Sequence, residues 1–261
     1  MKPQGRREVA ARIEGALRAT TGGVVAVDGD GTLWSGDVAE DLFYAFVERG
    51  RVEPEAERAI LRAAAEHGVD ASGTGAAVAR RIYGAYLDDR FPEEEVCELM
   101  TWCFAGWTRD KMQGFARDVM GAAGLEGRLN PELCDVLERI RPLDAEVFLV
   151  SASPRAVVEE AARIASIIAL THVVAATPVF TGDIMRAEVD RPIPYGPGKV
   201  SRLRERIGTR RLCAAFGDSA FDLPMLSEAA VPVAVRPKPK LRARAAEVDG
   251  LVELVAETQT L

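Results

Sequence analysis

The stretch that decides the fold is VVAVDGDGTLW, residues 24–34. Residues 24–27 have the length and the β-branched composition of a buried parallel strand, and Asp28 stands at its carboxyl end. Ligands of open α/β sheets bind at that end of the strands. The two glycines that follow allow a sharp turn whose backbone N–H groups can face an anion. Because two carboxylates so close together are costly to bury without a cation, Asp28 and Asp30 predict a charged ligand site.

The composition limits the class of protein. The 261 residues are 48% hydrophobic and 28% charged, as in a globular protein of one large or two modest domains. A net charge of −7 and a pI near 5.1 argue against a nucleic-acid partner. The four cysteines form no C-x-x-C pair, no apolar run follows the basic N-terminus, and no stretch is apolar enough to span a bilayer. These features predict a cytoplasmic protein without a membrane partner, and they leave the oligomeric state open.

Strand and helix patterns alternate along most of the chain. Short apolar runs predict strands at 24–27, 146–150, 173–177, 183–188, 212–216 and 231–235. Helical periodicity and caps predict helices at 8–19, 37–49, 54–66, 72–88, 92–105, 108–120, 131–141, 154–166, 198–207 and 222–227, with a last helix from 239 onward. This alternation indicates an α/β fold with a Rossmann-like, doubly wound parallel sheet and right-handed crossovers.

One long segment breaks the alternation. Residues 37–128 contain helical patterns and no convincing strand, so they predict an all-helical domain inserted after the first strand. The α/β core domain is then made of residues 1–36 and 129–261.

Polar or reactive groups follow three of the predicted strands. Asp28, Ser151 and Asp218 each stand at a strand end, and Lys199 opens a helix after a Gly-Pro-Gly turn. Because parallel strands bring their carboxyl ends to one edge, we expect these groups to form a cluster. The carboxylates suit Mg²⁺, which takes one or two carboxylates together with phosphate oxygens. The hydroxyl and the ammonium suit a phosphate.

In this order the motifs resemble those of the haloacid dehalogenase superfamily of phosphatases and phosphotransferases. The match consists of Asp28-Gly-Asp30-Gly-Thr32, Ser151 after an apolar strand, Lys199, and the run GDSAFD at 217–222. The inserted helices fall where many members carry a helical cap. The resemblance implies a Mg²⁺-dependent phosphatase in which Asp28 is the nucleophile and forms an aspartyl-phosphate. It implies that Asp30 acts first as general acid and then as general base.

The resemblance also assigns the supporting residues. Mg²⁺ is implied to be held by the Asp28 side chain, the main-chain carbonyl of Asp30, and Asp218, with Asp222 supporting the site from behind. Thr32, Ser151 and Lys199 are the implied phosphate contacts. The substrate is then a small phosphorylated metabolite.

Within the superfamily the chain is most similar to the branch that includes phosphoserine phosphatase. Three positions depart from that branch. A Ser-Ala-Ser turn at 151–153 stands for Ser-Gly-Gly, Phe221 for asparagine, and Asp37 for a glutamate early in the cap. These differences leave the implied phosphatase chemistry in place and put phosphoserine in doubt as the substrate. Asp37, Arg80 and Arg81 are the candidate substrate contacts of the inserted helices.

Other interpretations of these residues stay open. A phosphotransferase or phosphomutase would keep Asp28 and Asp30 but pass phosphate to an alcohol. A non-catalytic phosphate-binding regulatory protein is the alternative from another class, although a binder needs no nucleophile beside an acid. An aromatic cage for a quaternary ammonium is a second role for certain ring side chains, although core packing is commoner at their spacing; they are Trp34, Trp102, Phe104 and Trp107. The basic turn at 236–240 is predicted to be a solvated loop.

Overall fold

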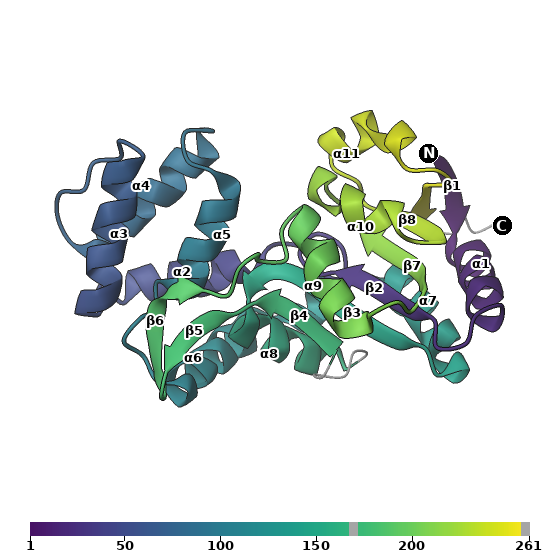
Figure 1. Ribbon diagram of the computed structural model, residues 1–261, viewed down its shortest axis with the longest axis horizontal. Coiled ribbons are helices and arrows are strands. Elements are labelled where there is room, and N and C mark those ends of the chain that lie inside the picture. Colours follow the sequence, from purple (N-terminus) through teal and green to yellow (C-terminus); the bar gives the residue numbers. More distant parts are fainter. Residues whose placement is uncertain (167–171, 257–261) are drawn as a thin grey trace.

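The computed structural model, which describes residues 1–166 and 172–256, is built on a seven-stranded parallel sheet (Figure 1). Its strand order is β1-β9-β8-β7-β2-β3-β4. The strands are β1 (Lys2–Gly5), β2 (Val24–Asp28), β3 (Glu146–Pro154), β4 (Val173–Ala176), β7 (Leu212–Gly217), β8 (Val231–Val235) and β9 (Val252–Val255). Helices cover both faces, so the predicted α/β fold class is confirmed.

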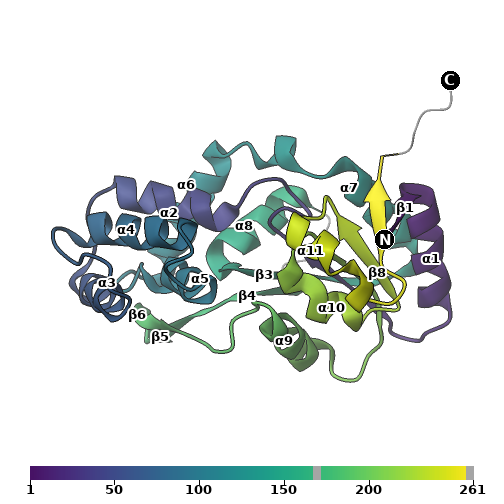
Figure 2. The same cartoon turned by 90° about the horizontal axis from the view of Figure 1, so that it is seen from above.

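The two faces of the sheet bury separate groups of side chains. Along β2, Val25 and Val27 join one hydrophobic cluster, whereas Val24 and Ala26 join the other. Figure 2 shows the helices of the first cluster on the opposite side of β3 from α9. The first cluster contains α1 (Arg6–Arg18), α7 (Pro131–Ile140) and α8 (Arg155–Ala165), and the second contains α9 (Pro197–Ile207), α10 (Leu223–Ser227) and α11 (Pro239–Ala243).

The five helices that follow β2, from α2 to α6, form a lobe beside the sheet (Figure 1), which we call the helical lobe. It consists of α2 (Val38–Glu48), α3 (Pro54–Glu66), α4 (Gly75–Leu87), α5 (Glu93–Trp102) and α6 (Arg109–Ala122). Side-chain caps start two of these helices: Asp37 accepts from the N–H groups of Ala39 and Glu40, and Thr108 accepts from that of Lys111. All residues from 37 to 128 are described, and none lies in a strand, as the sequence predicted. The division into two domains at these residues stays a prediction.

The chain leaves the core and returns to it at adjacent points. The N–H of Asn130 donates to the carbonyl of Leu33 at 2.9 Å, and Trp34 forms a β-bridge with Leu129. Arg128 ties the two connections together, because its Nε donates to the Ser35 carbonyl at 2.7 Å and its Nη1 pairs with Asp41 at 2.5 Å. A single arginine therefore fixes the base of the helical lobe.

Three features of the fold differ from the sequence predictions or add to them. The strands β1 and β9, which lie next to each other at one side of the sheet, were missed because each has only four residues and no continuous apolar run. The helix expected from residue 239 onward is wrong in length, because α11 ends at Ala243 and β9 follows. The hairpin of β5 (Pro178–Thr181) and β6 (Ile184–Val189) packs against the helical lobe, where Met185 and Trp107 are joined by a backbone hydrogen bond of 2.9 Å.

Among the described residues, no helix is both long enough and apolar enough to cross a lipid bilayer.

Candidate active site

The strand-end groups meet in one cavity. Strands β3 and β7 flank β2, so Ser151 and Asp218 are brought to either side of Asp28. A cavity of about 520 Å³ between this sheet edge and the helical lobe is lined by all three, and also by Asp30 and Lys199. The cluster predicted from the sequence is therefore present.

Two glycines make room for the carboxylates. Gly31 has a φ of +82°, and a Cβ there would overlap the Asp218 carboxylate. A Cβ on Gly217 would overlap the side chain of Asp222. The DGDGT turn and the Gly-Asp at the end of β7 thus need glycine because carboxylates from another segment occupy the space.

Asp28 is buried and held by two neighbours. Its Oδ1 accepts from Lys199 Nζ at 2.5 Å, and its Oδ2 accepts from the hydroxyl of Thr32 at 2.7 Å. Lys199 Nζ also donates to Asp222 Oδ1 at 2.5 Å. Burial, followed by the charge of Asp222, raises the pKa of Asp28 to about 8, although Lys199 opposes the shift. Burial disfavours the charge on Lys199, but Asp222 and Asp28 outweigh it and raise the pKa of this ammonium.

Asp30 is oriented by four donors. Its Oδ1 accepts from the indole N–H of Trp34 and from the N–H of Val38, both at 2.8 Å. Its Oδ2 accepts from the hydroxyls of Ser153 at 2.7 Å and Ser151 at 3.4 Å. The carboxylate is therefore fixed between the start of the helical lobe and the end of β3.

The donor set fits a hard divalent cation. Oxygens of Asp28, Asp218 and Asp222 lie within 4.8 Å of one another, and all three residues are buried. Asp222 Oδ2 already accepts from the Ser219 N–H and hydroxyl. The supporting role of Asp222 stays a prediction. Burial raises the pKa of Asp218, opposed by Lys238, whose Nζ lies 3.0 Å from its carboxylate. Buried carboxylate oxygens that outnumber the nearby ammonium groups suit Mg²⁺.

Comparison with known proteins agrees with this geometry. The family model described as haloacid dehalogenase-like hydrolase matches residues 25–227. The chain belongs to this family. The resemblance noted in the sequence is thus confirmed, and the protein is a haloacid dehalogenase-like hydrolase.

Solved structures show the same fold at low sequence identity. A Bordetella pertussis Tohama I protein of unknown function is 20% identical with a TM-score of 0.66, over 90% of this chain and 99% of that one. Cytosolic 5'-nucleotidase IIIB bound to cytidine is 14% identical with a TM-score of 0.62, over 96% and 86% of the two chains. A phosphoserine phosphatase, as an analogue of its phospho-aspartyl intermediate, is 14% identical with a TM-score of 0.51, over 89% and 92%. No curated protein matches the sequence.

Within this hydrolase, the remaining predicted residues lie at different distances from the cavity. Asp37 lines it while capping α2, and burial and the charge of Asp30 raise its pKa well above the usual range. Thr32 is fully buried and contacts Asp28 instead of the cavity. Arg80 and Arg81 do not line the cavity, and Arg81 binds the carbonyls of Asp70 and Ser72 instead. Their position does not support the predicted substrate contact.

The candidate aromatic cage is not formed. Trp34, Phe104 and Trp107 are buried in the main hydrophobic cluster, and Trp102 packs against it. None of the four lines the cavity.

Sequence reasoning missed several residues of the cavity, and two of them directly contact its carboxylates. Ser153 contacts Asp30 and belongs to the Ser-Ala-Ser turn already singled out, so its hydroxyl was the available signal. The basic turn at 236–240 is not simply a solvated loop, because Lys238 pairs with Asp218 and its N–H donates to the Asp218 carbonyl at 2.7 Å. Only the path of the chain after β8 reveals this contact.

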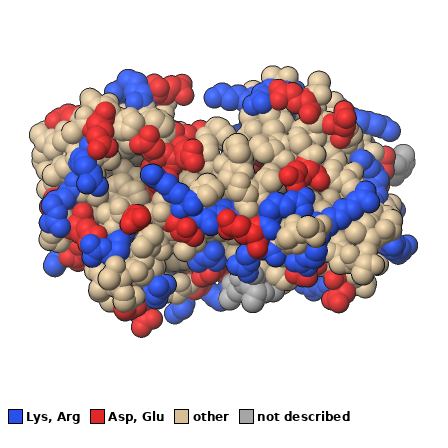
Figure 3. Space-filling model, in the orientation of Figure 1, with Lys and Arg blue, Asp and Glu red and all other residues tan. Residues whose placement is uncertain are grey.

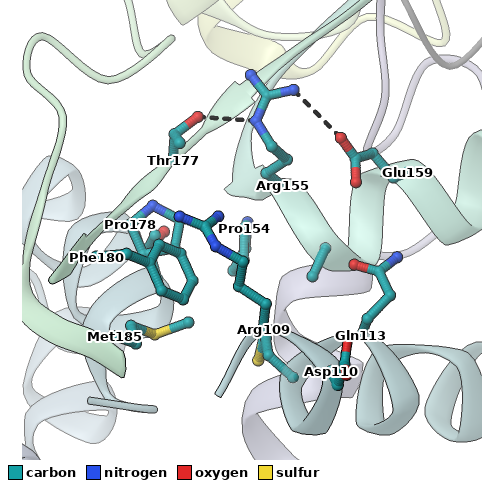
Figure 4. Close-up of a pocket in the computed structure, with 13 residues that line it drawn as sticks. Arg109, Asp110, Gln113, Pro154, Arg155, Glu159, Thr177, Pro178, Phe180 and Met185 are labelled. Carbon is teal, nitrogen blue, oxygen red and sulfur yellow. Dashed lines mark hydrogen bonds and ion pairs between the residues drawn. The ribbon is translucent and has the colours of Figure 1, made fainter. Parts of the chain in front are cut away.

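A second cavity of about 270 Å³ lies among α6, the start of α8 and the β5–β6 hairpin (Figure 4). There Arg155 binds Thr177 and Glu159, and the guanidinium of Arg109 lies 3.6 Å from the ring centre of Phe180. None of the strand-end groups lines this cavity, so the chemistry described above belongs to the first one.

Proposed function

We propose that this protein is a Mg²⁺-dependent phosphatase that hydrolyses a small phosphomonoester through an aspartyl-phosphate on Asp28. The observation that carries the proposal is the meeting of Asp28, Asp30, Ser151, Lys199 and Asp218 in one cavity. Membership of a hydrolase family supports it, and so does the fold shared with a phosphoserine phosphatase.

Asp28 is the nucleophile in this proposal. A carboxylate that attacks phosphorus divides one difficult displacement into two easier ones. Thr32 and Lys199 hold the two oxygens of Asp28 from different directions, so the attacking group is oriented before the substrate arrives. Lys199 keeps its positive charge despite burial and favours the anionic form of Asp28.

Asp30 is the general acid and then the general base in this proposal. It gives a proton to the leaving alkoxide and later takes one from the attacking water. The hydroxyls of Ser151 and Ser153 and the indole of Trp34 keep its carboxylate pointed into the cavity. When the substrate binds, the Ser151 hydroxyl turns from Asp30 and donates to a phosphate oxygen, while Ser153 and Trp34 keep Asp30 in place.

The residues that would hold Mg²⁺ are Asp28, Asp218 and the main-chain carbonyl of Asp30, with Asp222 anchored behind them by Ser219. When bound, Mg²⁺ supplies positive charge that stabilises the transferring phosphoryl group. The buried carboxylates need such a charge, because Lys199 and Lys238 do not balance them.

Phosphate release from p-nitrophenyl phosphate tests the proposal. We expect turnover with Mg²⁺, none with EDTA, and none in the Asp28→Asn variant. Adding an alcohol acceptor separates a phosphatase from a phosphotransferase, because a transferase forms the new phosphate ester in place of inorganic phosphate. Absence of turnover and of phosphoenzyme under all these conditions would favour a binding protein.

A further inference from the structure

The helical lobe forms the wall of the catalytic cavity that faces the strand ends. Its cavity-lining residues are Asp37, Ala39, Tyr86, Glu93, Cys97 and Met100. Two of them are carboxylic acids, and none is a lysine, an arginine or a histidine. If the phosphoryl group sits at the strand ends, this acidic and apolar wall is what the leaving group of the substrate meets.

The basic residues of the cavity lie on the opposite side. Lys199, Lys238 and Lys240 all belong to the core. Figure 3 shows the molecule hollowed between the helical lobe and the core, with acidic atoms on the lobe side and basic atoms on the core side. The basic side chains of the cavity therefore all come from the core, and the lobe wall contributes acids only.

Glu93 is the acid best placed to receive a ligand. It lies in the first turn of α5 and is only partly exposed. Within residues 1–166 and 172–256 its carboxylate accepts no hydrogen bond and belongs to no close ion pair. Burial raises the pKa of Glu93, and the charges of Lys238 and Lys240 act in the opposite direction. A half-buried carboxylate without a direct partner is stabilised by a cation placed beside it.

Three aromatic rings line the same cavity as Glu93. The rings of Tyr195 and Phe221 pack with their centres 4.4 Å apart, and Tyr86 faces the same cavity from α4. Glu93, Tyr86 and Tyr195 line the same cavity, and burial, followed by the charge of Glu93, raises the pKa of both phenols. The faces of such rings attract organic cations, and a neighbouring carboxylate adds to the attraction.

We propose that the leaving group is an organic cation, an amino alcohol whose ammonium binds between Glu93 and the rings of Tyr86, Tyr195 and Phe221. This inference rests on the proposed phosphatase function. The substrate is then a zwitterion, with its phosphate at the strand ends and its ammonium at the helical lobe.

Other phosphate esters fit this wall less well. The carboxylate of a phosphorylated amino acid would meet Asp37 and Glu93 with no basic side chain of the lobe to pair it. A neutral nucleobase carries hydrogen-bond acceptors, and the lobe wall offers it few donors beyond the hydroxyl of Tyr86. An ammonium group presents only positive charge and donors, which is what two acids and a set of aromatic rings can satisfy.

The first experiment compares two esters of equal shape. Phosphocholine and 3,3-dimethylbutyl phosphate differ by a positive nitrogen in place of a carbon. We expect kcat/KM with Mg²⁺ to favour phosphocholine or phosphoethanolamine over the neutral ester by about 10- to 100-fold. Equal values, or a better rate with phosphoserine or cytidine monophosphate, would overturn the inference and leave the phosphatase function intact. Failure to hydrolyse any ester, p-nitrophenyl phosphate included, would refute both.

The second experiment tests whether the charge of Glu93 selects the cationic ester. Glu93→Gln removes the charge but keeps the shape, and it should reduce the preference for the cationic ester over its neutral partner to within about threefold. Glu94→Gln is the matched control, because Glu94 neighbours it in α5 but is exposed and outside the cavity lining; this variant should retain the preference.

Phe221→Leu is an independent variant, which should lower the same ratio by removing one ring of the cavity. An equal loss for both esters in Glu93→Gln and Phe221→Leu would indicate a structural role and overturn the inference.

Discussion

The two ends of the catalytic cavity are built in different ways. At the strand ends the carboxylates have direct partners: Lys199 bridges Asp28 and Asp222, and Asp30 receives four donors. At the helical lobe, Glu93 has no direct partner in the described chain. Phosphoryl transfer requires side chains that are already fixed in place. The end that selects the leaving group instead keeps a carboxylate free to bind the substrate.

The largest expected effect comes from Asp28. The Asp28→Asn variant should lose at least about 10,000-fold in kcat, because an amide does not attack phosphorus. Phosphate release and ³²P labelling of the protein measure it, with Asp118→Asn, an exposed site on α6, as the control. Covalent phosphate on the Asp28→Asn protein would remove Asp28 from its assigned role.

Lys199 should affect both activity and folding. In Lys199→Met the carboxylates of Asp28 and Asp222 lose their shared cation, so the free energy of unfolding should fall by about 3 to 5 kcal/mol in metal-free protein. The kcat should fall by about 100-fold or more. Urea denaturation and steady-state kinetics measure the two effects. A variant as stable as the native protein would mean that the strand end is less tightly fixed than its contacts indicate.

Ser153 should have an intermediate effect. Ser153→Ala removes one of the four donors that orient Asp30, and kcat should fall by about 5- to 10-fold with little change in KM. Ser201→Ala, on the exposed side of α9, is the matched control. A change confined to KM would place Ser153 at the leaving group instead.

The pH dependence of stability sharpens the comparison further. The pKa of Asp28 is raised from its ordinary value of 3.8 to about 8 in the folded protein. Between these two pH values the folded protein therefore holds a proton that the unfolded chain has lost. In metal-free protein the stability from this group is therefore lost as pH rises from about 4 through 8. Melting temperatures in EDTA between pH 5 and pH 9 should fall less steeply for Asp28→Asn than for the native chain. Parallel curves would contradict the assignment.

The smallest effect is expected far from the cavity. Arg81 binds Asp70 and Ser72 at the outer part of the helical lobe, so Arg81→Ala should keep kcat/KM within about twofold. Kinetics on p-nitrophenyl phosphate and on the preferred ester are sufficient to check it. A tenfold rise in KM for the ester alone would show that the substrate reaches further along the lobe.

The difference between the two ends of the cavity also explains which site residues could be predicted from the sequence. Asp28, Ser151 and Asp218 were placed correctly because parallel strands must bring their carboxyl ends to one edge, whatever the packing around them. Glu93 is one of three successive glutamates at the start of α5, and only the rotation of the packed helix decides which of them enters the cavity. Lys238 carried a similar ambiguity, because its contact with Asp218 depends on how the chain turns after β8.

The strands of the fold also differed in how well they could be predicted. Strands with continuous apolar runs, such as β2 and β7, were predicted within a residue of their bounds. The strands β1 and β9 were missed, because their pairing with β8 and with each other defines them and their side chains do not. A strand of four residues is too short to show a clear hydrophobic pattern when its pairing with other strands defines it.

The contacts of Arg128 with Ser35 and Asp41 have a consequence for how such proteins diverge. Because they hold the exit and the return of the chain side by side, the sheet is closed beneath the inserted helices and does not depend on their length. An insertion can then be remodelled, lengthened or exchanged while the strands keep their register. Selectivity for a leaving group and the chemistry of phosphoryl transfer are thus free to evolve at separate rates within one chain.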